Sequence, residues 1–125
     1  MIEVSTIRLN DVVYKVNEHN QYFNRKKIRM TDENGVEWHR YDRPILNYTV
    51  DEYQLEGIVS VAVIGKVQHP DSYEDEYHFV NIETGKQYEV SPDDEFWASA
   101  FYNRAEAERV AAQLQLVHEE ELQND

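Results

Sequence analysis

The chain contains no cysteine and very little glycine or proline, with four glycines and three prolines among its 125 residues. The absence of cysteine excludes disulfides, thiolate catalysis and zinc sites built on thiolates. The four glycines form no phosphate-cradling loop, and none of the five serines lies in the glycine-flanked turn of a hydrolase nucleophile. The sequence therefore favours a non-enzymatic protein and predicts no cofactor.

Long apolar runs are also missing. No stretch approaches the ~20 apolar residues that a membrane-spanning helix needs. The N-terminus lacks the basic and then apolar segments of an export signal. We therefore expect a cytoplasmic protein that makes no membrane contact and folds as a single domain over residues 1–125.

The most apolar stretch, Tyr53–Val67, alternates in the manner of a strand and predicts the centre of a β-sheet. The alternation places Leu55 on the same face as Val59 and Val61. Because glycine inside a strand marks bulges and corners, Gly57 and Gly65 are the predicted bend points.

Shorter β-prone segments surround this strand and are separated by turn signals. Asn10-Asp11 predicts a turn within an opening hairpin, and Asn34-Gly35 and Gly85 predict turns of two later hairpins. The polar residues 17–24 are typical of a loop. The remaining predicted strands are Val4–Leu9, Val12–Val16, Lys26–Thr31, Val36–Tyr41, Ile45–Val50, Tyr77–Ile82 and Gln87–Val90.

One helix is predicted at the C-terminal end. Asn103, followed three residues later by Glu106, is typical of a helix start, and the helix is expected to reach about Glu121 before a frayed tail at 122–125. Its predicted apolar stripe consists of Ala107, Val110, Ala111, Leu114 and Val117 or His118.

The whole pattern predicts an α+β domain. Residues 1–102 are mainly β, with about seven strands in a strongly bent antiparallel sheet or a small SH3-like or OB-like barrel, and 103–121 form the helix that covers an open side or end.

The net charge of −13 is unevenly distributed. Residues 1–44 carry eight Lys and Arg against seven Asp and Glu, whereas residues 45–125 carry four against eighteen. An array of carboxylates can imitate the phosphates of nucleic acid and occupy a basic cleft of a partner protein. The alternative is that the acidity only maintains solubility. The predicted acidic face consists of Asp71, Glu74, Asp75, Glu76, Tyr77, Asp93, Asp94 and Glu95, and the wider array includes Glu83 and Glu89.

The one basic cluster lies in the hairpin predicted over residues 22–43. Basic residues beside aromatic rings are typical of single-stranded nucleic-acid binding, because the charges follow phosphates and the rings stack on bases. The alternatives are an edge strand that basic residues protect from aggregation, or a patch that docks on a second copy of the chain. The predicted nucleic-acid site consists of Arg25, Lys26, Lys27, Arg29, Trp38, Arg40 and Arg43.

A second loop combines two histidines with carboxylates. His69, Asp71, Glu74, Asp75, Glu76 and His78 fall within ten residues. Imidazoles and carboxylates are ligands of divalent metals, yet the spacing matches no metal motif, including the EF-hand loop. A solvated acidic loop is therefore favoured, and no metal is predicted.

Small size, absence of cysteine, strong acidity and lack of catalytic motifs are similar to the features of small accessory proteins encoded by bacteriophages. That resemblance implies a protein of the host cytoplasm that binds and inhibits a host factor. The leading hypothesis is accordingly an acidic protein that binds a basic surface of a protein partner; the alternative is a small β-barrel that binds RNA, single-stranded DNA or a nucleotide.

Overall fold

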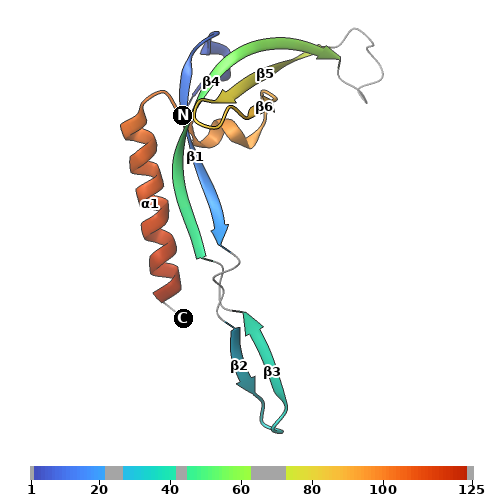
Figure 1. Ribbon diagram of the computed structural model, residues 1–125, viewed down its shortest axis with the longest axis vertical. Coiled ribbons are helices and arrows are strands. Elements are labelled where there is room, and N and C mark those ends of the chain that lie inside the picture. Colours follow the sequence, from blue (N-terminus) through green and yellow to red (C-terminus); the bar gives the residue numbers. More distant parts are fainter. Residues whose placement is uncertain (1, 22–26, 42–44, 63–72, 124–125) are drawn as a thin grey trace.

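The computed structural model describes residues 2–21, 27–41, 45–62 and 73–123. These residues form seven strands in two antiparallel sheets and one long helix, which confirms the α+β class (Figure 1). The strands are β1 (Val12–Gln21), β2 (Lys27–Thr31), β3 (Glu37–Tyr41), β4 (Ile45–Ala62), β5 (Tyr73–Asn81), β6 (Gln87–Val90) and β7 (Ala100–Phe101). Two 3₁₀ helices, η1 (Val4–Thr6) and η3 (Glu95–Ser99), and the helix α1 (Arg104–Gln123) complete the described elements.

The larger sheet is open. Its strand order is β6-β5-β4-β1-β7, so β6 and β7 are edge strands, and the predicted barrel does not close among the described residues. In the same ranges, no helix has both the length and the apolar character that crossing a membrane requires.

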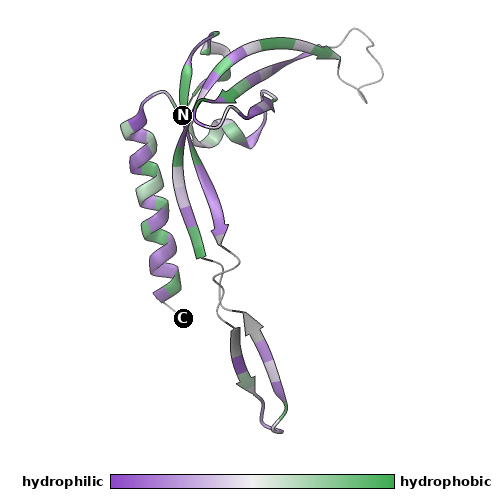
Figure 2. Cartoon of the chain, viewed as in Figure 1, coloured by the Kyte–Doolittle hydropathy of each residue, from purple (hydrophilic) through white to green (hydrophobic). Residues whose placement is uncertain are grey.

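β4 is the longest strand and links two pairings. Its first half pairs with β1, from Ile45 to Gln54, and its second half pairs with β5, from Tyr53 to Ala62. Figure 1 shows it arching over from one pairing to the other, and Figure 2 shows that its second half is its more hydrophobic part. The predicted central strand is therefore correct over Tyr53–Ala62 but begins earlier, at Ile45; residues 63–67, including Gly65, lie outside the described ranges.

A bulge interrupts the β4–β5 pairing at Glu56. Leu55 lies opposite Phe79, whereas Gly57 lies opposite the adjacent His78, so Glu56 is one extra residue on β4. The predicted bend at Gly57 is confirmed. Because one inserted residue inverts the alternation that follows it, Val59 and Val61 lie on the face opposite to Leu55, and the prediction that they share its face was wrong.

The predicted opening hairpin is not formed. The turn at Asn10 exists, with a φ of 71° at that residue, but the segment before it contains η1 instead of a strand. Ile2 and Ile7 of this segment are buried in the core. Its apolar residues therefore cover the sheet, and no strand pairing uses them.

β1 also extends through residues predicted as a loop. Asn17–Gln21 pair with β4 from Thr49 back to Ile45. Their polar composition predicted a loop, but β-propensity depends on context, and pairing with a distant strand overrides it here.

Both later hairpins are confirmed. Gly35, with a φ of 77°, lies in the turn between β2 and β3, and Gly85, with a φ of 73°, lies in the turn between β5 and β6. Glycine suits both positions because other residues adopt positive φ only at a cost. The ribbon of β2 and β3 projects beyond the end of the larger sheet (Figure 1).

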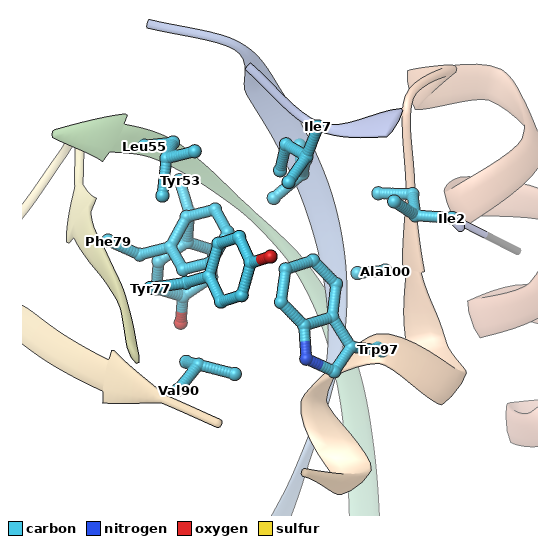
Figure 3. Packing of buried hydrophobic residues seen from close by; sticks show 10 residues of the cluster. Ile2, Ile7, Tyr53, Leu55, Tyr77, Phe79, Val90, Trp97 and Ala100 are labelled. Carbon is cyan, nitrogen blue, oxygen red and sulfur yellow. The ribbon is translucent and has the colours of Figure 1, made fainter. Parts of the chain in front are cut away.

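One face of the sheet carries an aromatic core (Figure 3). The Tyr77 and Trp97 rings meet edge to face with centroids 5.2 Å apart, and the Trp97 Nε1–H donates to the Ser91 carbonyl at 2.7 Å. η3 brings Trp97 to the sheet, and the Asp94 side chain caps this helix by accepting from the Phe96 N–H. The buried members are Ile2, Ile7, Val13, Tyr53, Leu55, Tyr77, Phe79, Val90, Trp97 and Ala100.

The other face of β1 and β4 packs against α1. Val16 and Phe101 contact Ala107 and Ala111, whose small side chains allow the helix to approach the sheet closely. The predicted cap is confirmed, since Asn103 Oδ1 accepts from the backbone N–H groups of residues 105 and 106.

The predicted stripe on α1 is correct only in part. Ala107, Ala111 and His118 are buried, whereas Leu114 and Val117 are exposed. The helix also continues two residues beyond Glu121, to Gln123, where the prediction had placed a frayed tail.

The C-terminal half of α1 protects an open strand edge. β5 pairs with β4 only from Tyr53 onward, so the edge of β4 before it has no partner strand among the described residues. Gln115 takes the place of a partner strand. Its Oε1 accepts from the Tyr48 N–H at 3.2 Å, and its Nε2 donates to the Leu46 carbonyl at 3.2 Å. His118 Nε2 accepts from the Leu46 N–H at 3.0 Å. Unpaired edges invite aggregation, so these two polar side chains protect the sheet.

Replacement of His118 should therefore weaken the protein. His118 is only 6% exposed, and His118→Ala leaves the Leu46 N–H without its acceptor, which should lower the free energy of unfolding by about 1 to 3 kcal/mol. The measurement is urea denaturation followed by circular dichroism. Leu116→Ala is the control, because Leu116 is 51% exposed on the same helix and its loss should cost little. Equal effects of the two substitutions would contradict this account of the edge.

The buried tyrosines lead to a second prediction, which concerns the stability of the protein at alkaline pH. Burial raises the pKa values of Tyr53 and Tyr77, and the Asp75 charge adds to the rise at Tyr77. Above pH ~10 the unfolded chain loses phenolic protons that the folded chain retains, so stability should fall as pH rises, by up to about 1.4 kcal/mol per pH unit and phenol.

Tyr53→Phe removes one of these phenols. The variant should lose less stability than the wild type between pH 8 and pH ~11, because one fewer group titrates differently in the two states. Leu55→Ala is the control, since it removes buried volume without a titrating group and should lower stability equally at both pH values. Parallel pH dependences of the wild type and Tyr53→Phe in urea denaturation would refute the prediction.

Candidate functional site

Beyond the bulge, one face of the larger sheet is uncovered and acidic. The registers place Glu76 opposite Val59, Glu74 opposite Val61 and His78 opposite Glu89, so these side chains share one face. α1 packs against β1, β4 and β7, away from this region, and Val59 remains 44% exposed. We define the carboxylate face as Val59, Val61, Glu74, Glu76, His78 and Glu89.

The structure divides the predicted acidic residues between opposite sides of the sheet. Glu74 and Glu76 lie on the carboxylate face, whereas the alternation of β5 places Asp75 and Tyr77 on the other side. Tyr77 is only 7% exposed and packs in the aromatic core, so its ring is not available to a partner.

Asp93, Asp94 and Glu95 lie at the start of η3, which covers the aromatic core on the side opposite to the carboxylate face. Asp71 lies outside the described residues. Glu89, which the sequence placed only in the wider acidic array, joins Glu76 because β6 pairs with β5. Only strand pairing could reveal that neighbour.

His78 occupies the centre of the carboxylate face. Its Nε2 lies 2.7 Å from Glu76 Oε1, and one ligand atom each of Glu76, His78 and Glu89 lie within 4.8 Å of one another. A hollow of about 460 Å³ lies beside them, lined by Glu56, His78, Gln87, Tyr88 and Glu89. Of the predicted histidine loop, Glu76 and His78 belong to this set, whereas Asp75 faces the other way. His69 and Asp71 lie outside the described residues.

The predicted nucleic-acid site is only partly visible. Arg25, Lys26 and Arg43 lie outside the described residues, while Lys27 and Arg40 occupy the β2–β3 ribbon, in register with Tyr41 and Ile28.

Trp38 and Arg29 do not form one surface. Arg29 lies opposite His39 and Trp38 lies opposite Met30, so Arg29 and Trp38 belong to opposite faces of the ribbon. Trp38 is 47% exposed. Arg29 already pairs with Glu37, which offsets its charge.

A lysine and a serine meet beneath the aromatic core. Lys15 Nζ donates to the Ser99 hydroxyl and, at 2.8 Å, to the Val16 carbonyl, and it lies 5.8 Å from the Phe96 ring centroid. Burial lowers the Lys15 pKa, and the charges of Asp94, Asp51 and Glu95 partly oppose that shift.

When a serine is hydrogen-bonded to a lysine of lowered pKa, the serine can act as a nucleophile and the lysine as its base. Neither Lys15 nor Ser99 lines the hollows described in this subsection. The pair joins β1 to η3.

A polar network lies on the same side as the aromatic core, farther along β1 and β4. Asn17 Nδ2 donates to Asp51 Oδ2 and, at 3.1 Å, to the Tyr53 hydroxyl, and His19 Nε2 lies 2.8 Å from Thr49 Oγ1. The network borders a second hollow of about 460 Å³. Sequence reasoning missed it because residues 17–21 were predicted as a loop, where Asn17 and His19 would not face β4.

Comparison of the chain with protein-family models, with characterised proteins and with solved structures finds no significant match.

Proposed function

We propose that the chain is a non-enzymatic binding protein that engages a basic surface of a partner protein through its carboxylate face. The observation that carries the proposal is the gathering of Glu74, Glu76 and Glu89 on one open sheet face. Among the described residues, none of these three carboxylates forms an ion pair with a lysine or arginine. Their negative charge therefore remains available to a partner.

The composition of this face also suits protein recognition. Val59 and Val61 on β4 lie directly opposite Glu76 and Glu74 on β5, so the face offers apolar area beside charge. Burial of apolar area contributes affinity, while charge complementarity accelerates association and excludes wrong partners. The carboxylates are held on paired strands, which lowers the entropy lost on binding.

The resulting activity would be inhibition of the partner, because the chain would occupy the partner's basic cleft. A partner that binds nucleic acid presents a basic cleft, and a carboxylate face seated there competes with phosphates. This is the mode expected of a phage-type inhibitor of a host protein, acting as a nucleic-acid mimic.

Two matched charge reversals test the proposal. The tagged protein is used to capture a partner from nuclease-treated bacterial lysate, and the purified pair is then measured by surface plasmon resonance over a salt series. Glu74→Lys with Glu89→Lys should weaken binding at least about 10-fold, mainly by slowing association. Asp93→Lys with Glu95→Lys changes the net charge equally on the η3 side and is the control.

The outcomes distinguish binding through the carboxylate face from an effect of the net charge of the whole chain. Selective loss in the Glu74 and Glu89 variant, with wild-type affinity that falls as salt is added, supports the carboxylate face. Equal weakening by both reversals indicates that only net charge matters. Undiminished binding in both, or affinity insensitive to salt, refutes the electrostatic proposal.

The second candidate function is nucleic-acid binding by the β2–β3 ribbon. The observation in its favour is Trp38, whose 47% exposed ring projects from a ribbon that also contains basic residues. Stacking of a base on such a ring contributes about 1 to 3 kcal/mol.

Fluorescence anisotropy with labelled single-stranded DNA and RNA at low ionic strength tests this alternative. If it is correct, Trp38→Ala should weaken binding by about 1 to 3 kcal/mol. Val36→Ala is the control, since it removes an exposed apolar side chain of the same ribbon that offers no ring. Absence of any binding at low salt refutes this function and leaves the carboxylate face unaffected.

A further inference from the structure

We propose that Glu76, His78 and Glu89 bind a divalent transition-metal ion, with Zn²⁺ as the representative. The three residues come from neighbouring strands, Glu76 and His78 from β5 and Glu89 from β6. Their ligand atoms already converge within 4.8 Å. Two donors on one zinc ion lie about 3 to 3.5 Å apart, given zinc–ligand bonds of about 2.0 to 2.2 Å. Metal binding therefore requires the 2.7 Å hydrogen bond between Glu76 and His78 to open slightly and the exposed Glu89 side chain to rotate toward them.

The electrostatics of the set also favour a cation. Glu76 contacts only His78 among the interactions of the described residues, and Glu89 has no hydrogen bond or ion pair with any described residue. Strand pairing nevertheless holds both carboxylates close to the same imidazole. A bound cation would relieve the repulsion between them, because opposite charge at this distance stabilises both ionised groups.

The imidazole determines which class of cation fits. Mg²⁺ and Ca²⁺ prefer oxygen ligands, whereas imidazole nitrogen suits zinc and the neighbouring transition metals. One nitrogen and two carboxylates provide three protein ligands. The adjoining hollow, of about 460 Å³, leaves room for water or a further ligand at the remaining position.

The position of the set explains how it could be pre-organised. His78 is one of the residues opposite the bulge, and it pairs with Gly57 on β4 and with Glu89 on β6. Pairing on both sides fixes the backbone of β5 at Glu76 and His78, and the pairing of β6 with β5 holds Glu89 beside His78. Glycine at 57 leaves space above the imidazole that a larger cross-strand side chain would occupy.

This inference goes beyond the proposed function, although the ligand set lies within the carboxylate face. Metal binding is measured on the isolated chain and needs no partner. Glu74, which belongs to the carboxylate face but not to the ligand set, separates the two proposals: Glu74→Lys should impair partner binding and retain the zinc site.

The experiment is isothermal titration calorimetry of the full chain with ZnCl₂, repeated in a large excess of Mg²⁺. We expect saturable binding of one Zn²⁺ per chain at this set, which Mg²⁺ does not displace. His78→Asn and Glu89→Gln should each weaken it at least about 10-fold. His39→Asn is the control: it removes an exposed strand histidine of the β2–β3 ribbon and should change affinity by less than about 2-fold.

Each result decides the proposal. Loss in both ligand variants with retention in the control supports it. Absence of saturable binding, displacement by Mg²⁺, unchanged affinity in His78→Asn, or equal loss in His39→Asn overturns it. Circular dichroism verifies the fold of each variant, and if His78→Asn fails to fold, Glu89→Gln, at an exposed position, decides instead.

Discussion

The extra residue at Glu56 determines which side chains of the larger sheet lie together. Before it, Tyr53 and Leu55 point into the aromatic core. After it the alternation is inverted, so that Val59 and Val61 turn to the open face and lie opposite Glu76 and Glu74. A strand of the same composition without the bulge would place those valines on the side of the aromatic core, and the carboxylate face would lose its apolar members.

The sheet is covered on opposite faces along its length. α1 packs on one face of the β1–β4 pairing, whereas η3 and the N-terminal segment cover the other face where β4 pairs with β5. Each part of the sheet therefore retains one open face, and both open faces are polar. One contains the network of Asn17 and Asp51, and the other contains Glu76, His78 and Glu89. The candidate sites follow from this arrangement, because charged side chains without hydrogen-bond partners cost free energy where an apolar layer covers a sheet.

Polar side chains also complete the structure where the backbone lacks partners. Gln115 and His118 occupy the open edge of β4, and Lys15 joins β1 to η3. Each of these side chains connects residues far apart in the sequence. Each also provides a hydrogen-bond partner for a polar group on another element. Glu74, Glu76 and Glu89 are separate from these contacts and lie on an open sheet face, where a charged group keeps its solvation.

The sequence by itself determined the local elements. The Asn34-Gly35 and Gly85 turns and the Asn103 cap follow from the conformational preferences of single residues, and the α+β class follows from the order of the elements. Only the tertiary structure decided which surfaces exist. The strand at Asn17–Gln21, the burial of Tyr77, and the meeting of Glu89 with His78 all depend on pairing between distant segments. The physical reason is that a turn or a cap is set by neighbouring residues, whereas strand register and the sheet face that becomes covered are set by long-range packing.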